Sequence, residues 1–98
     1  MLVLTRSAGE SLLIGKSVLV VRRLAPSVAL VVSRPGLVNE FEFSLQDIAG
    51  QPVIQLEEGL VKLMQVQRTE ITLAIDAPRD VPILRGELRP RSPRTGSD

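Results

Sequence analysis

Alternation of hydrophobic and polar residues runs through most of the chain and predicts a fold built mainly from antiparallel β-strands. Short runs rich in Val, Leu and Ile are separated by Gly, Pro, Ser and Asn, and β-branched residues suit the pleated surface of a sheet. Two pairs of such runs, each joined by a short turn, have the pattern of β-hairpins. These hairpins span residues 17–33 and 60–75.

The other predicted strands are short, and one helical turn accompanies them. The strands span residues 1–6, 11–14, 40–44 and 53–56. In the third of these, Glu alternates with Phe41 and Phe43, so both aromatic side chains should face inward. Ser44 and Asp47 have the spacing of a capping box, and Gly50 is placed to end a helix, which predicts the helical turn.

The N-terminal strand and the last apolar segment have a similar arrangement of side chains. Alternate residues of a strand share a face, so Leu4 and Arg6 lie together on the first strand. The same rule groups Val81, Ile83 and Arg85 after the turn that follows the second hairpin. Each end therefore offers a strip of aliphatic side chains that finishes in an arginine.

Composition restricts the chemistry available to this chain of 98 residues. It contains no Cys and no His, which excludes disulfides, thiolate metal sites and the commonest general base. The glycines are isolated, so no phosphate-binding loop is present. Glu57 and Glu58 read as a solvated turn rather than a metal-ligand pair. We therefore expect a protein that is not an enzyme and has no cofactor or metal. A chain this small also gains stability by dimerising.

Charge is distributed unevenly although the formal net charge is only +1. Residues 1–34 carry five basic and one acidic side chain, whereas residues 35–61 carry five acidic side chains and no basic one. Residues 62–98 carry seven basic and five acidic side chains. The two ends could attract a polyanion that the middle would repel. No apolar run approaches the roughly 20 residues of a spanning helix, so we expect a soluble cytoplasmic protein without membrane contact.

Four segments, in a fixed order, carry a family pattern. They are MLVLTR (1–6), GESLLIG (9–15), the hairpin at 60–75, and DAPRDVPILRGEL (76–88). Together they cover about half of the chain and resemble the carbon storage regulator family (CsrA/RsmA), small bacterial RNA-binding regulators of translation.

The resemblance implies an all-β, mainly antiparallel fold that forms an interlocked homodimer. In that fold the first strand of one chain lies beside the last strand of the other, and the two strands bind GGA-containing hairpin loops in mRNA leaders. The implied function is sequence-specific post-transcriptional regulation, with mRNA leaders and small regulatory RNAs as partners. Aliphatic side chains would lie under the bases while the arginines contact base edges and phosphates. The implied RNA-binding residues are Leu4, Thr5, Arg6, Ala77, Pro78, Arg79, Val81, Ile83 and Arg85.

The chain departs from the family pattern in three places. Ser7 stands where the family usually has a basic residue, and a Pro-rich segment replaces the usual C-terminal helix. A β-rich, acidic insertion occupies about residues 17–57 of a single domain (1–88), and we expect it to decorate the dimer or cover a sheet edge. The two ends of this insertion must lie close together. Residues 89–98 contain no apolar residue and should be disordered.

Other interpretations stay open. Another alignment makes residues 17–33 the family hairpin, and the loose similarity of the two hairpins fits either a partial internal duplication or the general likeness of hairpins. The chain could have weakened RNA binding and act through a protein partner on the insertion. It could also be a swapped-hairpin DNA-binding regulator or a purely structural β module.

Overall fold

A computed structural model describes residues 1–86, which form nine strands and one short helix. The prediction of a mainly antiparallel β-protein with one helical turn is confirmed. The elements are β1 (Leu2–Ser7), β2 (Ser11–Ile14), β3 (Ser17–Arg23), β4 (Val28–Arg34), β5 (Leu37–Phe43), α1 (Leu45–Ala49), β6 (Val53–Gln55), β7 (Leu60–Val66), β8 (Glu70–Asp76) and β9 (Ile83–Arg85).

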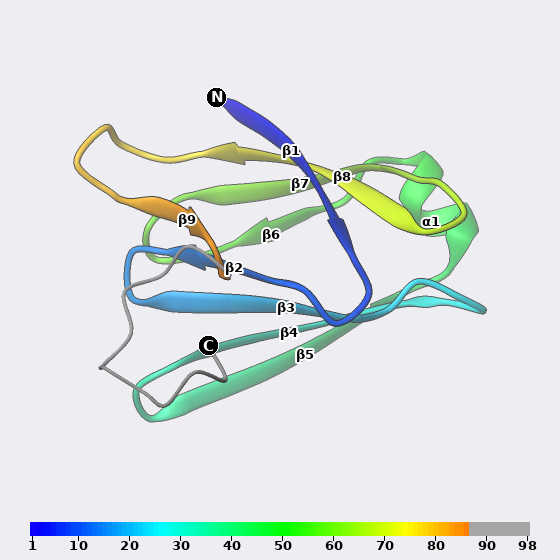
Figure 1. Cartoon of the computed structure of the whole chain (residues 1–98), viewed down its shortest axis with the longest axis horizontal. Coiled ribbons are helices and arrows are strands. Elements are labelled where there is room, and N and C mark those ends of the chain that lie inside the picture. The colour runs from blue at the N-terminus through cyan, green and yellow to red at the C-terminus, as the bar shows by residue number, and fades with distance from the viewer. Residues whose placement is uncertain (87–98) are drawn as a thin grey trace, which may run out of the picture.

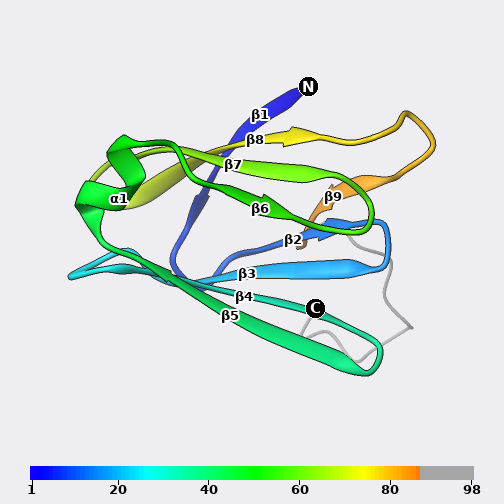
Figure 2. The ribbon, with the colours of Figure 1, turned by 180° about the vertical axis from the view of Figure 1, so that it is seen from behind.

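The strands form two antiparallel sheets whose inner faces share one core. One sheet has the order β1-β8-β7-β6 and the other β5-β4-β3-β2-β9. Figures 1 and 2 show the sheets as two layers, with β1 running obliquely from the first layer toward β2 in the second. Because consecutive strands change sheet at the β1–β2, β5–β6 and β8–β9 connections, the chain links the layers three times.

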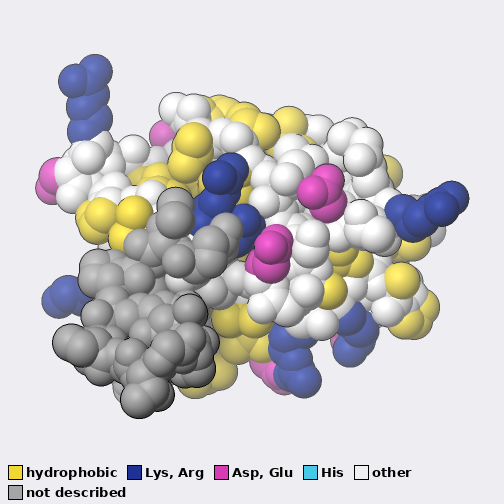
Figure 3. Space-filling model, in the orientation of Figure 1, with side chains coloured by type: hydrophobic (Ala, Val, Ile, Leu, Met, Phe, Trp, Pro, Cys, Tyr) yellow, Lys and Arg dark blue, Asp and Glu magenta, His cyan; other side chains and the backbone are white. Residues whose placement is uncertain are grey.

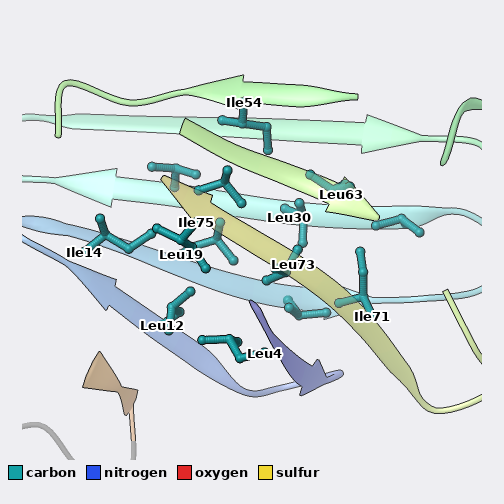
Figure 4. Packing of buried hydrophobic residues seen from close by; sticks show 14 of the residues in the cluster. Leu4, Leu12, Ile14, Leu19, Leu30, Ile54, Leu63, Ile71, Leu73 and Ile75 are labelled. Atoms are coloured by element: carbon teal, nitrogen blue, oxygen red, sulfur yellow. The ribbon is translucent and has the colours of Figure 1, made fainter. Parts of the chain in front are cut away.

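Period-two burial in the long strands confirms the predicted hairpins. Buried and partly buried residues alternate along β3, β4 and the first part of β7, and the buried aliphatic ones belong to a single hydrophobic cluster. Leu4, Leu12, Leu30 and Leu73 meet in this cluster from four different strands (Figure 4). Phe41 and Phe43 also pack against it, as their alternation with Glu predicted.

The two sheets repeat one arrangement of strands. In each sheet an edge strand is followed by the two strands of a hairpin and then by a fourth strand. The order is β1-β8-β7-β6 in one sheet and β5-β4-β3-β2 in the other. Both hairpins contain a bulge at the same register, between Val21 and Arg23 in one and between Leu63 and Gln65 in the other. Buried aliphatic side chains occupy matching registers, in the pairs Leu12 and Ile54, Ile14 and Leu56, Leu19 and Val61, Val21 and Leu63, Val28 and Ile71, Leu30 and Leu73, and Val32 and Ile75.

The helical turn α1 marks a difference between the halves. It lies in the β5–β6 connection, where the equivalent β1–β2 connection is a tight turn. The capping box predicted from sequence is present, because the Ser44 hydroxyl accepts a hydrogen bond from the Asp47 amide while the Asp47 carboxylate accepts one from the Ser44 amide. Gly50 ends the helix, as expected.

The last strand is shorter than its apolar sequence suggests. Pro82 has no amide hydrogen for a sheet ladder, and its carbonyl accepts a hydrogen bond from Gly15 instead (2.9 Å). Val81 donates to the carbonyl of Pro78 (3.0 Å), which closes a turn before β9. As a result β9 pairs with β2 only over residues 83–85.

Residues 17–57 are integral to the fold. They supply β3, β4, β5, α1 and β6, and β3 and β4 lie inside the five-stranded sheet, so this segment is not an appended decoration. The expected closeness of its ends is confirmed, because the Glu58 carboxylate accepts hydrogen bonds from the Ser17 hydroxyl (2.8 Å) and the Lys16 amide (3.0 Å). The predicted disordered tail at 89–98 lies outside the described residues.

Candidate nucleic-acid interface

The strands β1 and β9 are the terminal strands of different sheets, and they meet at a shared cavity. The cavity has a volume of about 270 Å³. Its lining combines aliphatic side chains from both strands with one arginine: Leu2, Val3, Leu4, Ile83, Leu84 and Arg85. The chain therefore brings its N-terminal strand and its last strand together without a second copy.

The parity predicted for the first strand is confirmed. β1 pairs with β8, and Leu4 and Arg6 are buried on one face while Val3 and Thr5 are exposed on the other. Val3 is 56% exposed, and Leu2 at the strand start is 43% exposed. The edge strand β1 thus exposes apolar side chains to solvent.

Arg6 lies deeper than expected for a residue that contacts RNA. Only 5% of its surface is exposed, and its guanidinium donates hydrogen bonds to the carbonyls of Thr5 (3.0 Å) and Ser11 (3.1 Å). The Glu10 carboxylate lies 3.6 Å from the Arg6 Nε atom and also accepts a hydrogen bond from the Ser7 amide (2.7 Å). In this position Arg6 ties β1 to the start of β2.

Arg85 lies at the end of β9, on the same side of the molecule as Arg6. It pairs in register with Leu12, so the next residue, Gly86, lies against Ser11, whose carbonyl binds Arg6. A Cβ at Gly86 would meet the Ser11 hydroxyl, which would have to move, and would lie close to the Ser11 carbonyl (3.3 Å), so glycine suits this approach. Arg85 itself is exposed and is the arginine that lines the cavity, so it is available to a ligand there.

The other predicted site residues lie in or near the loop between β8 and β9. Ala77 and Val81 are partly buried and pack against the core, whereas Pro78 and Arg79 are exposed. This loop adjoins β9 but does not line the cavity.

Sequence reasoning missed three lining residues, Leu2, Val3 and Leu84. Parity separated Val3 and Leu84 from the expected binding faces. The only feature of the sequence that could have identified these residues was their position in the first and last predicted strands. Such strands can lie at sheet edges, where side chains of both faces reach the surface.

Glu58 is not the solvated residue that the sequence suggested, although Glu57 is. The Glu58 side chain is 12% exposed and the Glu57 side chain 76% exposed, and both carboxylates lie near Arg34. Desolvation raises the pKa of Glu58, but hydrogen bonds from Ser17 and the Lys16 amide, with the charge of Arg34, outweigh it and lower the pKa overall. Glu58 thus joins the β2–β3 turn to the β6–β7 turn. Among residues 1–86 no cluster of carboxylates suits a metal ion.

The edge equivalent to β1 in the other half is β5, and it is acidic. Glu40 pairs with Arg22 (2.7 Å) and Glu42 with Arg23 (2.6 Å). Hydrogen bonds from Ser27 and from Arg23 lower the pKa of Glu42. The cavity between this edge and β6 is smaller, at about 110 Å³.

The basic and hydrophobic side chains are close neighbours on one face. Figure 3 shows Lys and Arg side chains near the centre of that face, with hydrophobic side chains beside them and acidic ones on one flank. A larger cavity of about 510 Å³ lies elsewhere, beside α1 and the tip of the β7–β8 hairpin. Its lining is mostly apolar, with Arg68 as the one charged residue, so it lacks the converging polar groups of a typical ligand site.

Comparisons with protein-family models, with curated proteins and with solved structures found no match to this chain. In the part of the chain that the structure describes, no helix has both the length and the apolar character to cross a membrane.

Proposed function

We propose that the protein binds single-stranded RNA along the β1–β9 edge and thereby controls translation. The observation that carries the proposal is the cavity between the edge strands β1 and β9, which is lined by aliphatic side chains and Arg85. The four sequence segments that resemble the carbon storage regulator family include both of these strands.

The chemistry of the edge suits unpaired bases. Exposed aliphatic side chains such as Val3 and Leu2 can pack against base faces, and the outer backbone groups of a terminal strand are free to bond base edges. The guanidinium of Arg85 matches O6 and N7 of guanine and can also contact phosphate. An RNA loop with splayed-out purines fits this combination better than a duplex.

The resemblance supplies the finer specificity, which is GGA-containing hairpin loops in mRNA leaders. A guanine-rich core agrees with readout by arginine. The resemblance also predicts a cytoplasmic location and small regulatory RNAs as competing partners, and these stay predictions. It predicts a homodimer as well, although β1 and β9 of a single chain already line one cavity.

The rival function, weakened RNA binding with action through a protein partner, draws support from one observation. Arg6 is 5% exposed and engaged with Ser11, so it contributes less to RNA than the resemblance implies. On this alternative the wild-type protein would not shift a GGA hairpin at micromolar concentration.

A gel-shift experiment with Arg85→Ala tests the proposal. Losing an arginine that reads a base should cost about 1–3 kcal/mol, or roughly 5- to 150-fold in Kd. Arg68→Ala is the matched control, because Arg68 is exposed on the β7–β8 turn beside α1. Equal losses in both variants, or duplex DNA competing as well as the hairpin, would contradict the proposal.

A further inference from the structure

β1 and β5 lie at equivalent edges of the two sheets. At the opposite edges, β9 pairs with the outer side of β2, whereas within residues 1–86 no strand pairs with the equivalent side of β6. We infer that one chain supplies both halves of the binding arrangement and forms a single RNA site, at β1–β9, as a monomer. The RNA part of this inference rests on the proposed function.

The repeat is established by register as well as by strand order. β1 pairs with β8 and β5 with β4, so that Leu4 opposite Leu73 corresponds to Phe41 opposite Leu30. The same alignment sets Arg6 against Phe43. The bulges and buried positions of the two central hairpins agree with it. One chain therefore contains the same four-strand arrangement twice, as β1-β8-β7-β6 and as β5-β4-β3-β2.

The lengths of the connections after β8 and after β4 explain why a strand pairs with the outer side of β2 and none with that of β6 within residues 1–86. After β8, the loop at residues 77–82 carries the chain across to the other sheet, where β9 pairs with β2. After β4, only Pro35 and Gly36 intervene before β5, and Gly36 adopts a φ of +81° in this turn. The first half thus has no residues left to form a strand beside β6.

The chemistry of β5 also argues against a second site. The positions equivalent to Val3 and Thr5 hold Glu40 and Glu42, and Phe43 replaces the arginine. Carboxylates along a strand edge repel phosphates. Glu40 and Glu42 also form ion pairs with Arg22 and Arg23, so these two arginines already have acidic partners.

A disulfide trap tests whether β9 pairs with its own chain. Leu13 and Leu84 are direct partners in the β2–β9 pairing, and opposed residues of antiparallel strands lie within disulfide reach. The chain has no native Cys, so Leu13→Cys with Leu84→Cys gives one defined pair. We expect oxidation to yield a cross-linked monomer without free thiols. Disulfide-linked dimers, in excess of those formed by Leu13→Cys alone, would overturn the inference.

The wild-type protein provides a second, independent test. Light scattering with and without a GGA hairpin should give a mass near 10.7 kDa for the free protein and one hairpin per chain in the complex. A stable dimer, or two hairpins per chain, overturns the inference and leaves the proposed function standing. A monomer that binds no hairpin overturns the proposed function and the single site with it.

Discussion

The β1–β9 edge and the β5–β6 edge occupy equivalent places in the two halves, yet they differ in the charge of the residues that line them. The first has a cavity of about 270 Å³ whose one charged lining residue is Arg85, whereas β5 lines a cavity of about 110 Å³ and another of about 270 Å³, and the latter contains Glu40 and Glu42 beside Arg22 and Arg23. The same scaffold therefore supports two different surfaces, so the fold alone does not determine what either edge would bind.

The interior shows the opposite behaviour, since the two halves match closely there. Leu30 and Leu73 are both fully buried at the same register, and each pairs with a residue of its edge strand. Packing tolerates few alternatives at such positions, whereas an exposed strand face tolerates many. The two halves can therefore diverge at their edges without losing their common core.

The largest expected effect is on stability, from truncating the equivalent core residues. Leu30→Ala and Leu73→Ala should each reduce the free energy of unfolding by about 2–5 kcal/mol. Because both halves share one cluster, denaturant unfolding should remain a single transition in each variant. Two separate transitions, or a loss confined to one half, would contradict the shared core.

A smaller effect is expected at the junction of the halves. Glu58→Gln should cost about 1–3 kcal/mol, because it weakens the charge-assisted hydrogen bonds from Ser17 and the Lys16 amide. Since the folded pKa of Glu58 is lowered, its stabilisation is present above pH 4.5, its ordinary pKa, and is lost as the pH falls through the lower folded value.

Urea denaturation of the wild type and of Glu58→Gln between pH 3 and pH 7 measures this contribution. The difference in stability should shrink toward the acid end. Glu57→Gln is the control, because Glu57 is mostly exposed and should change stability by less than about 1 kcal/mol. A difference independent of pH would show that the Glu58 charge has no part in joining the turns.

The smallest expected effect comes from exchanging residues between the two edges. Thr5→Glu copies Glu42 onto β1 and should weaken hairpin binding by on the order of tenfold, since it places a carboxylate beside the phosphates. Glu42→Thr, the reciprocal change, should leave binding unchanged. Filter binding at fixed salt measures both, and tighter binding by the second variant would place RNA on β5.

Local features of the fold were predictable from sequence, and long-range ones were not. The hairpins, the inward Phe41 and Phe43 and the capping box at Ser44 follow from alternation and spacing within a few residues. The pairing of β1 with β8 depends on contacts about 70 residues apart, which no local pattern encodes. A partial internal duplication was one of two open interpretations of the hairpins. The sequence did not decide between them, because the halves share a burial pattern rather than residue identity and only Pro35 and Gly36 separate β4 from β5.

The candidate site was predictable in part. Parity placed Leu4 with Arg6 and identified the two strands, and Arg85 lies where it can reach a ligand. The burial of Arg6 depends on the turn that carries Glu10 and Ser11 around its guanidinium, and a one-dimensional pattern does not reveal such wrapping.

Amide chemical-shift mapping by NMR during titration with a GGA hairpin tests whether RNA lies on the β1–β9 edge. We expect the largest shifts on β1 and on residues 81–86, while β5 and β6 stay unchanged. Shifts of equal size on β5 and β6, or shifts centred on the cavity beside α1, would contradict it.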